Sequence, residues 1–247
     1  MCGRFNLRTT ASELAEFFDT ILDPQLELSL TPRFNITPSQ PVLVIRNHAD
    51  HADHAETVSL DWGLVPTWAK NAAAGKRMTP LINARGETVS DKPSFRSAFR
   101  HRRCLMPASG FYEWQKTTGT TKQPWHIHRP DDALMAFAAI WEQRQDDDGS
   151  VIESCAIITT EANSLMAPIH HRMPVVLEPS DFAAWLDPHI SSHERLEPIH
   201  RLLRPCPDHA LVAEPIDTRI NRPANEGPDC LRPANSTTSG GDGLLFD

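Results

Sequence analysis

Several features that would place a protein in a special class are missing from this sequence. No apolar run approaches the roughly 18 residues that a membrane-spanning helix needs, and the N-terminus lacks the apolar core of a secretory signal. The five cysteines form no CxxC pair and their number is odd, which argues against a disulfide framework or a structural zinc site. We therefore expect a cytoplasmic protein with no membrane partner, no metal and no cofactor.

Glycine is scarce relative to proline, with 11 glycines against 21 prolines, which favours extended segments and rigid turns over long helices. Apolar periodicity predicts mostly strands with short helices between them. Strands are expected at residues 41–46, 57–66, 102–109, 110–116, 124–129, 134–143, 154–162 and 210–216. Helices are expected at residues 9–21, with Thr10 and Glu13 as a capping box, at 179–187, with Ser180 as its cap, and at 192–204.

This pattern predicts an α+β fold built on mostly antiparallel sheets. Residues 2–221 are expected to form one domain. Residues 222–247 are rich in Pro, Gly, Ser and Asn, and we expect them to be a disordered tail. The connector 47–56 carries three histidines at three-residue spacing, and we interpret it as a polar hairpin tip rather than a metal site.

Charge is unevenly distributed along the chain, although the net charge is −8. Residues 1–130 hold 16 Lys+Arg against 12 Asp+Glu, whereas residues 131–247 hold 8 against 20. Within residues 76–129 the count is 11 basic to 3 acidic. Such a stretch can attract a phosphate backbone even on an acidic protein, although an ordinary solvated basic face has the same composition.

The chain opens with "MCGRFN", which places a cysteine directly after the initiator methionine. Removal of Met1 would leave Cys2 with a free α-amine and a thiol two carbons apart. Their reference pKa values are about 7.7–8.0 and about 8.5, so both reactive forms are accessible near neutral pH. Such a residue can attack an amide carbon or capture an aldehyde. The alternative is that Cys2 is simply the buried start of a strand.

Three further stretches carry candidate chemistry. In "PLINARGET", Asn83 could orient an amine or hydroxyl, or could merely end a strand. In "SGFYEWQK", Glu113 shares a strand face with Phe111, and aromatic surroundings would raise its pKa and suit it to proton transfer; it could equally be an exposed or arginine-paired edge residue. In "PIHHRMPVVL", His170 or His171 could act as an acid, or could simply be a buried hydrogen-bonding histidine.

Six motifs occur together in one order: "MCGRF", "PRFNITPSQ", "WGLVPTW", "INARGET", "RRCLMPASGFYEW" and "IHHRMPVVL". Over residues 2–220 they resemble the SRAP (SOS response-associated peptidase) family, whose members are also called abasic site processing proteins. The resemblance implies an α+β fold with a barrel-like core and a few flanking short helices. It also implies self-removal of Met1 and covalent capture of abasic sites in single-stranded DNA, by an imine on the Cys2 amine that the thiol closes into a thiazolidine.

The resemblance also implies roles for individual residues. The catalytic set is Cys2, Asn83, Glu113 and His170. The residues matching the family's DNA-contacting positions are Arg4, Asn35, Pro38, Trp68, Arg85, Trp114, Thr159 and Arg172. His171 stands where some relatives carry an acidic residue, and residues 70–78 form an insertion after Trp68. The protein is expected to be a monomer that joins the nucleoid when engaged on DNA.

Two other functions compete with this interpretation. Glutamine amidotransferases of the Cys2 class also begin Met-Cys-Gly, but this chain has no room for their synthase domain. A noncatalytic single-strand DNA-binding module would bind without using Cys2. The word peptidase is interpreted narrowly, because nothing in the sequence resembles a protease that cuts other proteins.

Overall fold

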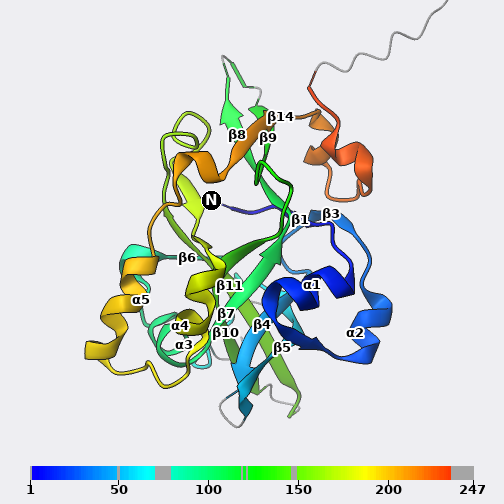
Figure 1. The fold of residues 1–247 in the computed structure, drawn as a ribbon. Coiled ribbons are helices and arrows are strands. Elements are labelled where there is room, and N and C mark those ends of the chain that lie inside the picture. The colour runs from blue at the N-terminus through cyan, green and yellow to red at the C-terminus, as the bar shows by residue number, and fades with distance from the viewer. Residues whose placement is uncertain are drawn as a thin grey trace, which may run out of the picture.

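The computed structural model describes residues 2–48, 51–69, 79–117, 119–120, 122–145 and 149–234. They form two sheets with short helices around them (Figure 1). The five-stranded sheet contains, in order, β14 (Val212–Pro215), β9 (Lys122–His128), β8 (Gly110–Lys116), β1 (Phe5–Leu7) and β3 (Arg33–Ile36). The larger sheet contains β12 (Arg172–Pro174), β11 (Val151–Glu161), β10 (Met135–Gln145), β7 (Arg103–Ala108), β4 (Pro41–His48), β5 (His51–Trp62) and β2 (Thr20–Leu22), with β13 (Val176–Leu177) paired to β10 and β6 (Asn83–Arg85) paired to β11.

Five strands of the larger sheet close into a barrel. The sequence of neighbours β11-β10-β7-β4-β5 returns to β11, because β5 pairs with β11 in parallel at Asp61–Ser154 and Trp62–Cys155. The other pairings around this ring are antiparallel. The expected α+β class with mostly antiparallel sheets and a barrel-like core is therefore confirmed. The β4–β5 hairpin is longer than expected, since His48 pairs with His51 within the predicted connector.

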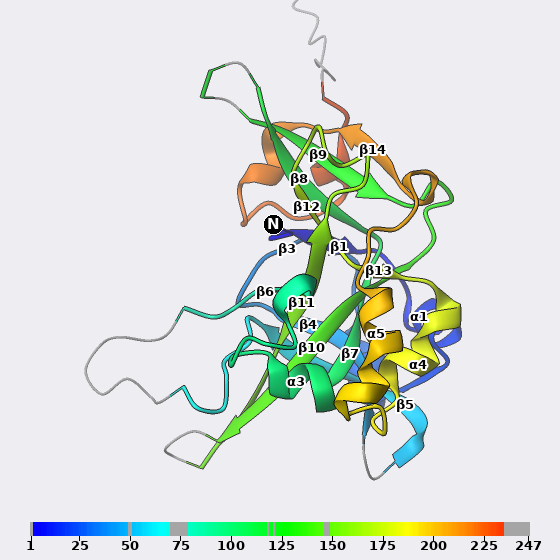
Figure 2. The same cartoon turned by 90° about the vertical axis from the view of Figure 1, so that its left-hand side faces the viewer.

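Aromatic side chains join the five-stranded sheet to the barrel. The Phe5 ring on β1 lies 5.2 Å from Trp62 on β5 and 6.1 Å from Phe137 on β10, both edge-on. Phe111 on β8 contacts Phe137 in the same manner, with ring centroids 5.9 Å apart. Because such rings are fully buried and tightly packed, they fix the N-terminal strand against the barrel. The N-terminus consequently lies at the junction of the two sheets in both views (Figures 1 and 2).

The helices are short and lie outside the sheets. They are α1 (Ala11–Phe18), α2 (Pro24–Ser29), α3 (Arg96–His101), α4 (Phe182–Leu186) and α5 (Glu197–Leu202). The predicted Thr10–Glu13 capping box is present at α1. The predicted Ser180 cap is wrong, because Pro179–Asp181 forms a 3₁₀ turn that runs into α4 and places Ser180 inside it. Among the described residues, no helix has both the length and the apolar character that crossing a bilayer requires.

Residues 216–234, which we call the C-terminal clasp, fold against the five-stranded sheet. The clasp contains two 3₁₀ turns, Thr218–Asn221 and Pro228–Leu231. Its buried residues Ile216, Ile220 and Cys230 form a small cluster with Tyr112. The prediction of disorder from residue 222 is therefore wrong for residues 222–234, because a few apolar side chains anchor a segment of polar average composition. Residues 235–247 lie outside the described part of the chain.

Candidate functional site

The five-stranded sheet contributes Cys2 and Glu113 to the junction between the sheets. β1 and β8 are antiparallel, with Phe5 opposite Phe111, and the Tyr112 amide donates to the Arg4 carbonyl at 2.9 Å. This register brings the start of the chain alongside Glu113. Side chains on β8 alternate as predicted, since Phe111 faces the main core while Tyr112 and Trp114 face the clasp. Cys2 is fully buried and Glu113 is 4% exposed.

The larger sheet contributes Asn83 and His170. β6 lies parallel to β11, which sets Asn83 at the edge of the barrel, where its side-chain amide donates to the Cys2 carbonyl at 2.9 Å. The other side-chain atom of Asn83, Oδ1, is buried and accepts no hydrogen bond from the described residues. His170 ends the turn before β12, and Gln115 on β8 fixes that turn by donating to the Pro168 carbonyl at 3.0 Å.

Burial changes the acid–base properties of Glu113 and Cys2. It raises the pKa of Glu113 above its ordinary value, because an ionised carboxylate loses solvation there. The pKa of the Cys2 thiol is raised as well, mainly by desolvation and further by the nearby Glu113 charge. A hydrogen bond from the Arg4 backbone amide lowers this pKa in part. The thiol is thus neutral near pH 7, and a buried carboxyl stands beside it to exchange protons.

His170 lies within reach of Glu113. Its Nδ1 atom is 4.0 Å from Glu113 Oε1. The Arg172 amide lies 3.0 Å and the Arg172 carbonyl oxygen 3.1 Å from the same Nδ1, so the neutral ring accepts from the amide or donates to the carbonyl according to its tautomer. Burial lowers the pKa of His170, which favours this neutral form. The His171 ring stacks on His170 with centroids 4.4 Å apart, but it is exposed.

Arg172 is held by an extensive set of contacts. It is buried, it forms a two-pronged ion pair with Glu87 at 2.5 and 2.9 Å, and it donates to the Thr159 carbonyl at 2.7 Å. The pKa of Glu87 is lowered chiefly by its hydrogen bond to Arg172. The Arg172 backbone contacts Nδ1 of His170, so Arg172 also orients the histidine ring. The contribution of Glu87 was not predicted, although its position two residues after Arg85 in "INARGET" was the available signal.

An open groove of about 630 Å³ lies on the other face of β8. Its described lining residues are Arg4, Trp114, Thr120, Lys122, Thr218 and Asn221. The Arg4 guanidinium lies 5.5 Å from the centroid of the Trp114 ring, and Arg4 is two residues from Cys2. The groove therefore combines two cations with an indole, on the face of β8 opposite to Glu113. Thr218 and Asn221 were not predicted, because they fall next to the segment expected to be disordered.

The remaining predicted residues do not gather at one surface. Asn35 and Thr159 are 1% and 0% exposed, and both have internal hydrogen-bond partners. Pro38 is half-buried, Arg85 is exposed and Trp68 is 57% exposed. Burial places Asn35 and Thr159 in supporting positions rather than on an open surface. The insertion at residues 70–78 lies outside the described residues.

The described cations of the basic stretch 76–129 do not form one continuous face either. Arg103 is 5% exposed and donates to carbonyl oxygens of Phe99, Arg100, Trp185 and Asp187. Arg102 forms an ion pair with Glu142 at 2.8 Å. These arginines stabilise the α3–β7 region, so the local charge count overstates the positive surface.

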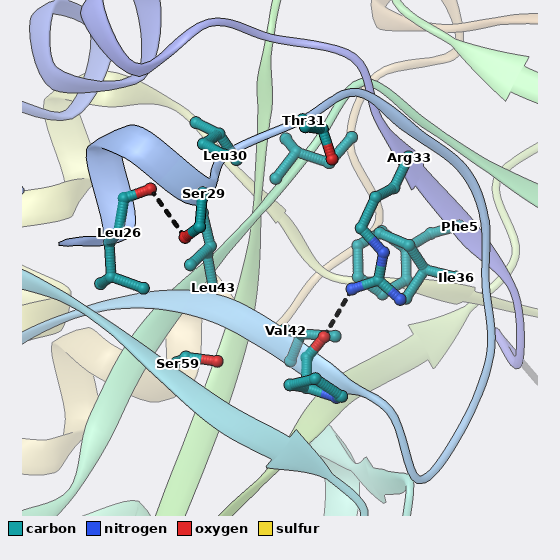
Figure 3. A pocket seen from close by; sticks show the side chains of 12 residues that line it. Phe5, Leu26, Ser29, Leu30, Thr31, Arg33, Ile36, Val42, Leu43 and Ser59 are labelled. Carbon is teal, nitrogen blue, oxygen red and sulfur yellow. Dashed lines mark hydrogen bonds between the residues drawn. The ribbon is translucent and has the colours of Figure 1, made fainter. Parts of the chain in front are cut away.

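A second cavity, of about 200 Å³, lies between α2 and the strands β3 and β4 (Figure 3). Leucine and isoleucine side chains make up much of its wall, and the Arg33 guanidinium within it donates to the Pro41 carbonyl at 2.6 Å. It contains neither Cys2 nor Glu113. The chemistry-bearing residues therefore belong to the sheet junction and not to this cavity.

This chain is similar in sequence to proteins of one family and similar in fold to a solved structure. A sequence model of the family described as SOS response associated peptidase (SRAP) matches residues 1–223. "Abasic site processing protein YoqW" of Bacillus subtilis (strain 168) is 37% identical over 232 residues, which cover 94% of this chain and 99% of the relative. "Abasic site processing protein HMCES" of Rattus norvegicus is 30% identical over 237 residues, which cover 83% of this chain and 65% of the relative. The X-ray crystal structure of a protein from Bacteroides thetaiotaomicron aligns with a TM-score of 0.79 at 25% identity, over 94% of this chain and all of that chain.

Proposed function

This chain belongs to the SOS response associated peptidase (SRAP) family, and we propose that it captures abasic sites in single-stranded DNA as a covalent adduct on Cys2. Two relatives are named abasic site processing proteins, which supports an abasic site as the substrate. The single observation that carries the proposal is the placement of Cys2. It is held by Asn83 through its carbonyl and lies beside a buried carboxyl of raised pKa.

The proposed reaction begins with removal of Met1, because an amide nitrogen is a poor nucleophile and the free Cys2 amine is a good one. The amine adds to the aldehyde carbon of the ring-opened sugar, and loss of water gives an imine. The thiol then adds to the imine carbon, and its proton passes to the nitrogen, which closes a five-membered thiazolidine. The net change is aldehyde plus aminothiol to thiazolidine plus one water. Holding both nucleophiles on one residue makes the second addition intramolecular, which can gain effective molarities of order 10⁵ M or more.

Glu113 is the group suited to move these protons. Its raised pKa brings it closer to neutrality, where a carboxyl can both accept a proton from the amine or thiol and return one to the departing water. We assign it the same role in cleavage of the Met1–Cys2 bond, which would be the peptidase activity of this protein. Asn83 orients the Cys2 backbone, and His170, whose Nδ1 lies 4.0 Å from Glu113, would donate a hydrogen bond to the sugar oxygen.

The groove on the other face of β8 suits a single strand. The Arg4 and Lys122 cations would contact phosphates, and the exposed part of the Trp114 indole would stack on a base of any sequence. The groove is open rather than enclosed, so a strand could enter from the side. A stacked base requires an unpaired strand, which supports single-stranded rather than duplex DNA as the form that is bound.

Denaturing gel electrophoresis tests the proposal. Wild-type protein is incubated with single-stranded DNA that carries one abasic site, and matched lanes contain the same strand without the lesion. We expect a heat-stable, lesion-dependent adduct. The Cys2→Ala variant keeps an α-amine after Met1 removal, so borohydride should trap its imine although no heat-stable adduct forms. A heat-stable adduct of wild-type yield from Cys2→Ala would show that another residue is the nucleophile, and glutamine hydrolysis without any adduct would favour an amidotransferase.

A further inference from the structure

The C-terminal clasp contributes to the wall of the groove on the face of β8 that carries Trp114. Thr218 and Asn221 line that groove together with Arg4 and Trp114. The two ends of the clasp are held together, since the Asp217 amide donates to the Arg232 carbonyl at 2.8 Å and the Ala234 amide donates to the carbonyl of Pro215, the last residue of β14, at 2.9 Å. Figures 1 and 2 both show this segment in orange beside β1 and β3. The groove therefore depends on a segment far from Cys2 in the sequence.

Asn221 fixes the Trp114 side chain. The indole Nε1–H donates to Asn221 Oδ1 at 2.7 Å. An indole has one donor and no acceptor, so this bond defines the rotation of the ring about its side-chain torsions. Asn221 itself is exposed, whereas its neighbour Ile220 is fully buried against Tyr112 and anchors the 3₁₀ turn. The asparagine is thus held in place by the buried core of the clasp.

The clasp also fixes Arg4. One guanidinium nitrogen of Arg4, Nη1, donates to the Ile220 carbonyl at 2.9 Å and to Asn35 Oδ1 at 2.6 Å. Asn35 in turn donates to the Arg222 and Asn225 carbonyls at 3.0 and 2.8 Å. These bonds use a single guanidinium nitrogen, and the planar group is oriented over the Trp114 ring.

We propose that the clasp is a positioning element for DNA, in which Asn221 sets the stacking face of Trp114 while the Ile220 carbonyl and Asn35 set the guanidinium of Arg4. The clasp pre-orders both groups before the strand arrives, so binding requires less loss of side-chain freedom. The family's sequence model matches this chain only up to residue 223, whereas the clasp continues to residue 234. This inference rests on the proposed function, because it assumes that the groove binds a strand.

A double-mutant cycle tests the Asn221–Trp114 contact. The probe is fluorescently labelled oligothymidine without a lesion, and its dissociation constant is measured for wild type, Asn221→Ala, Trp114→Phe and the double variant. Losing one hydrogen bond should raise the dissociation constant of Asn221→Ala by about three- to tenfold. In the Trp114→Phe background, which lacks the indole N–H, the same truncation should change it less than about twofold. Asn47→Ala on β4 is the matched control and should bind like wild type.

Intrinsic fluorescence supplies a readout that does not depend on DNA. The difference spectrum between wild type and Trp114→Phe isolates the Trp114 emission, and Asn221→Ala should shift that emission because the indole loses its partner. Equal affinity of Asn221→Ala and wild type, or additive effects in the cycle, would overturn the positioning role while leaving the proposed function intact. A wild-type protein that does not bind oligothymidine would overturn both. If Asn221→Ala fails to fold, Asn221→Ser replaces it in the cycle, with the same expected coupling.

Discussion

At the scale of single residues, the site is defined by reactive groups that are buried away from solvent. Glu113 and Cys2 are buried beside each other, and each pKa is raised mainly because its charged form is poorly solvated. Asn83 completes the arrangement by holding the Cys2 carbonyl at 2.9 Å. A buried carboxyl normally destabilises a fold unless it is compensated, so its presence here is consistent with a chemical role.

The stability of the fold should depend on pH through Glu113. Below about pH 4.3 the carboxyl is protonated in both the folded and unfolded states. As pH rises toward the raised folded pKa, only the unfolded state ionises, so the contribution of the neutral carboxyl to stability is lost. Glu113→Gln should therefore gain stability relative to wild type between about pH 4.3 and that folded value, at about 1.4 kcal/mol per unit of pKa difference. Urea midpoints at pH 4, 6 and 8 measure this, and a difference that stays constant over that range would contradict it.

The candidate residues could be identified from sequence only in part. Cys2, Glu113 and a histidine at position 170 or 171 stand out because their types suit nucleophilic attack or proton transfer, whereas the role of Asn83 and the choice of His170 come from the family resemblance. The contact between Asn83 and Cys2 could not be derived from spacing, since it depends on the parallel β6–β11 pairing at the edge of the barrel. The burial of Asn35 and the Glu87–Arg172 ion pair could not be predicted from the sequence either, because each depends on contacts with residues distant in the sequence.

At the scale of elements, regular patterns were predictable and irregular packing was not. The alternating apolar residues of β8 and the Thr10–Glu13 capping box are local signals, and both are present in the structure. The clasp was missed because its average composition is polar, while only Ile216, Ile220 and Cys230 anchor it. Local signals also say little about which strands become neighbours. The β5–β11 pairing that closes the barrel could therefore not be predicted from the sequence.

The packing of β8 against β9 depends on glycine at position 110. A Cβ atom there would lie 2.2 Å from Nε2 of the buried His126, which in turn lies 3.0 Å from the Asn6 side-chain amide. Burial lowers the pKa of His126 to about 3, so the ring is neutral and accepts that hydrogen bond. Gly110→Ala should therefore destabilise the protein by about 1–3 kcal/mol through overpacking.

Chemical denaturation measures the effect of Gly110→Ala. The control is His126→Ala, which removes the ring that the new methyl group would strike. In that background Gly110→Ala should cost much less than in wild type, because the two residues are in direct contact. Equal losses in both backgrounds would show that the clash with His126 is not the cause.

Asn35 should control the stability of the clasp. Its side-chain amide donates to two clasp carbonyls, those of Arg222 and Asn225. Asn35→Ala should increase hydrogen exchange of amides in residues 216–234 relative to the barrel strands, because the clasp loses two of its hydrogen bonds to β3. Exchange measured by mass spectrometry tests this, with Asn47→Ala as the control. Unchanged protection of the clasp in Asn35→Ala would contradict the assigned role.

At the scale of the whole molecule, the net charge of −8 conceals an uneven surface. The described residues that line the groove include Arg4 and Lys122 and no carboxylate. Several other cations of the basic stretch are used internally, as the Arg103 contacts with four carbonyl oxygens show. We therefore expect DNA affinity to depend on a few groove cations and not on overall charge.

Salt dependence measures how many of these cations contact phosphate. Affinity for oligothymidine should fall as salt rises, and Arg4→Gln should reduce the slope of log K against log salt by about 0.7 for one lost contact. Arg201→Gln, the same change on the exposed helix α5, is the matched control and should leave the slope unchanged. A slope unaffected by Arg4→Gln would remove this arginine from the phosphate contacts.

The most direct test of the central claim is the mass of the purified protein–DNA adduct and of its N-terminal peptide. The protein is incubated with single-stranded DNA that carries one abasic site, and the product is digested and analysed by mass spectrometry. We predict a mass equal to the protein without Met1 plus the strand minus one water, with the modification on Cys2 and no free thiol at that residue. An adduct that retains Met1, or that maps to any other residue, would contradict the assignment of Cys2 as the nucleophile.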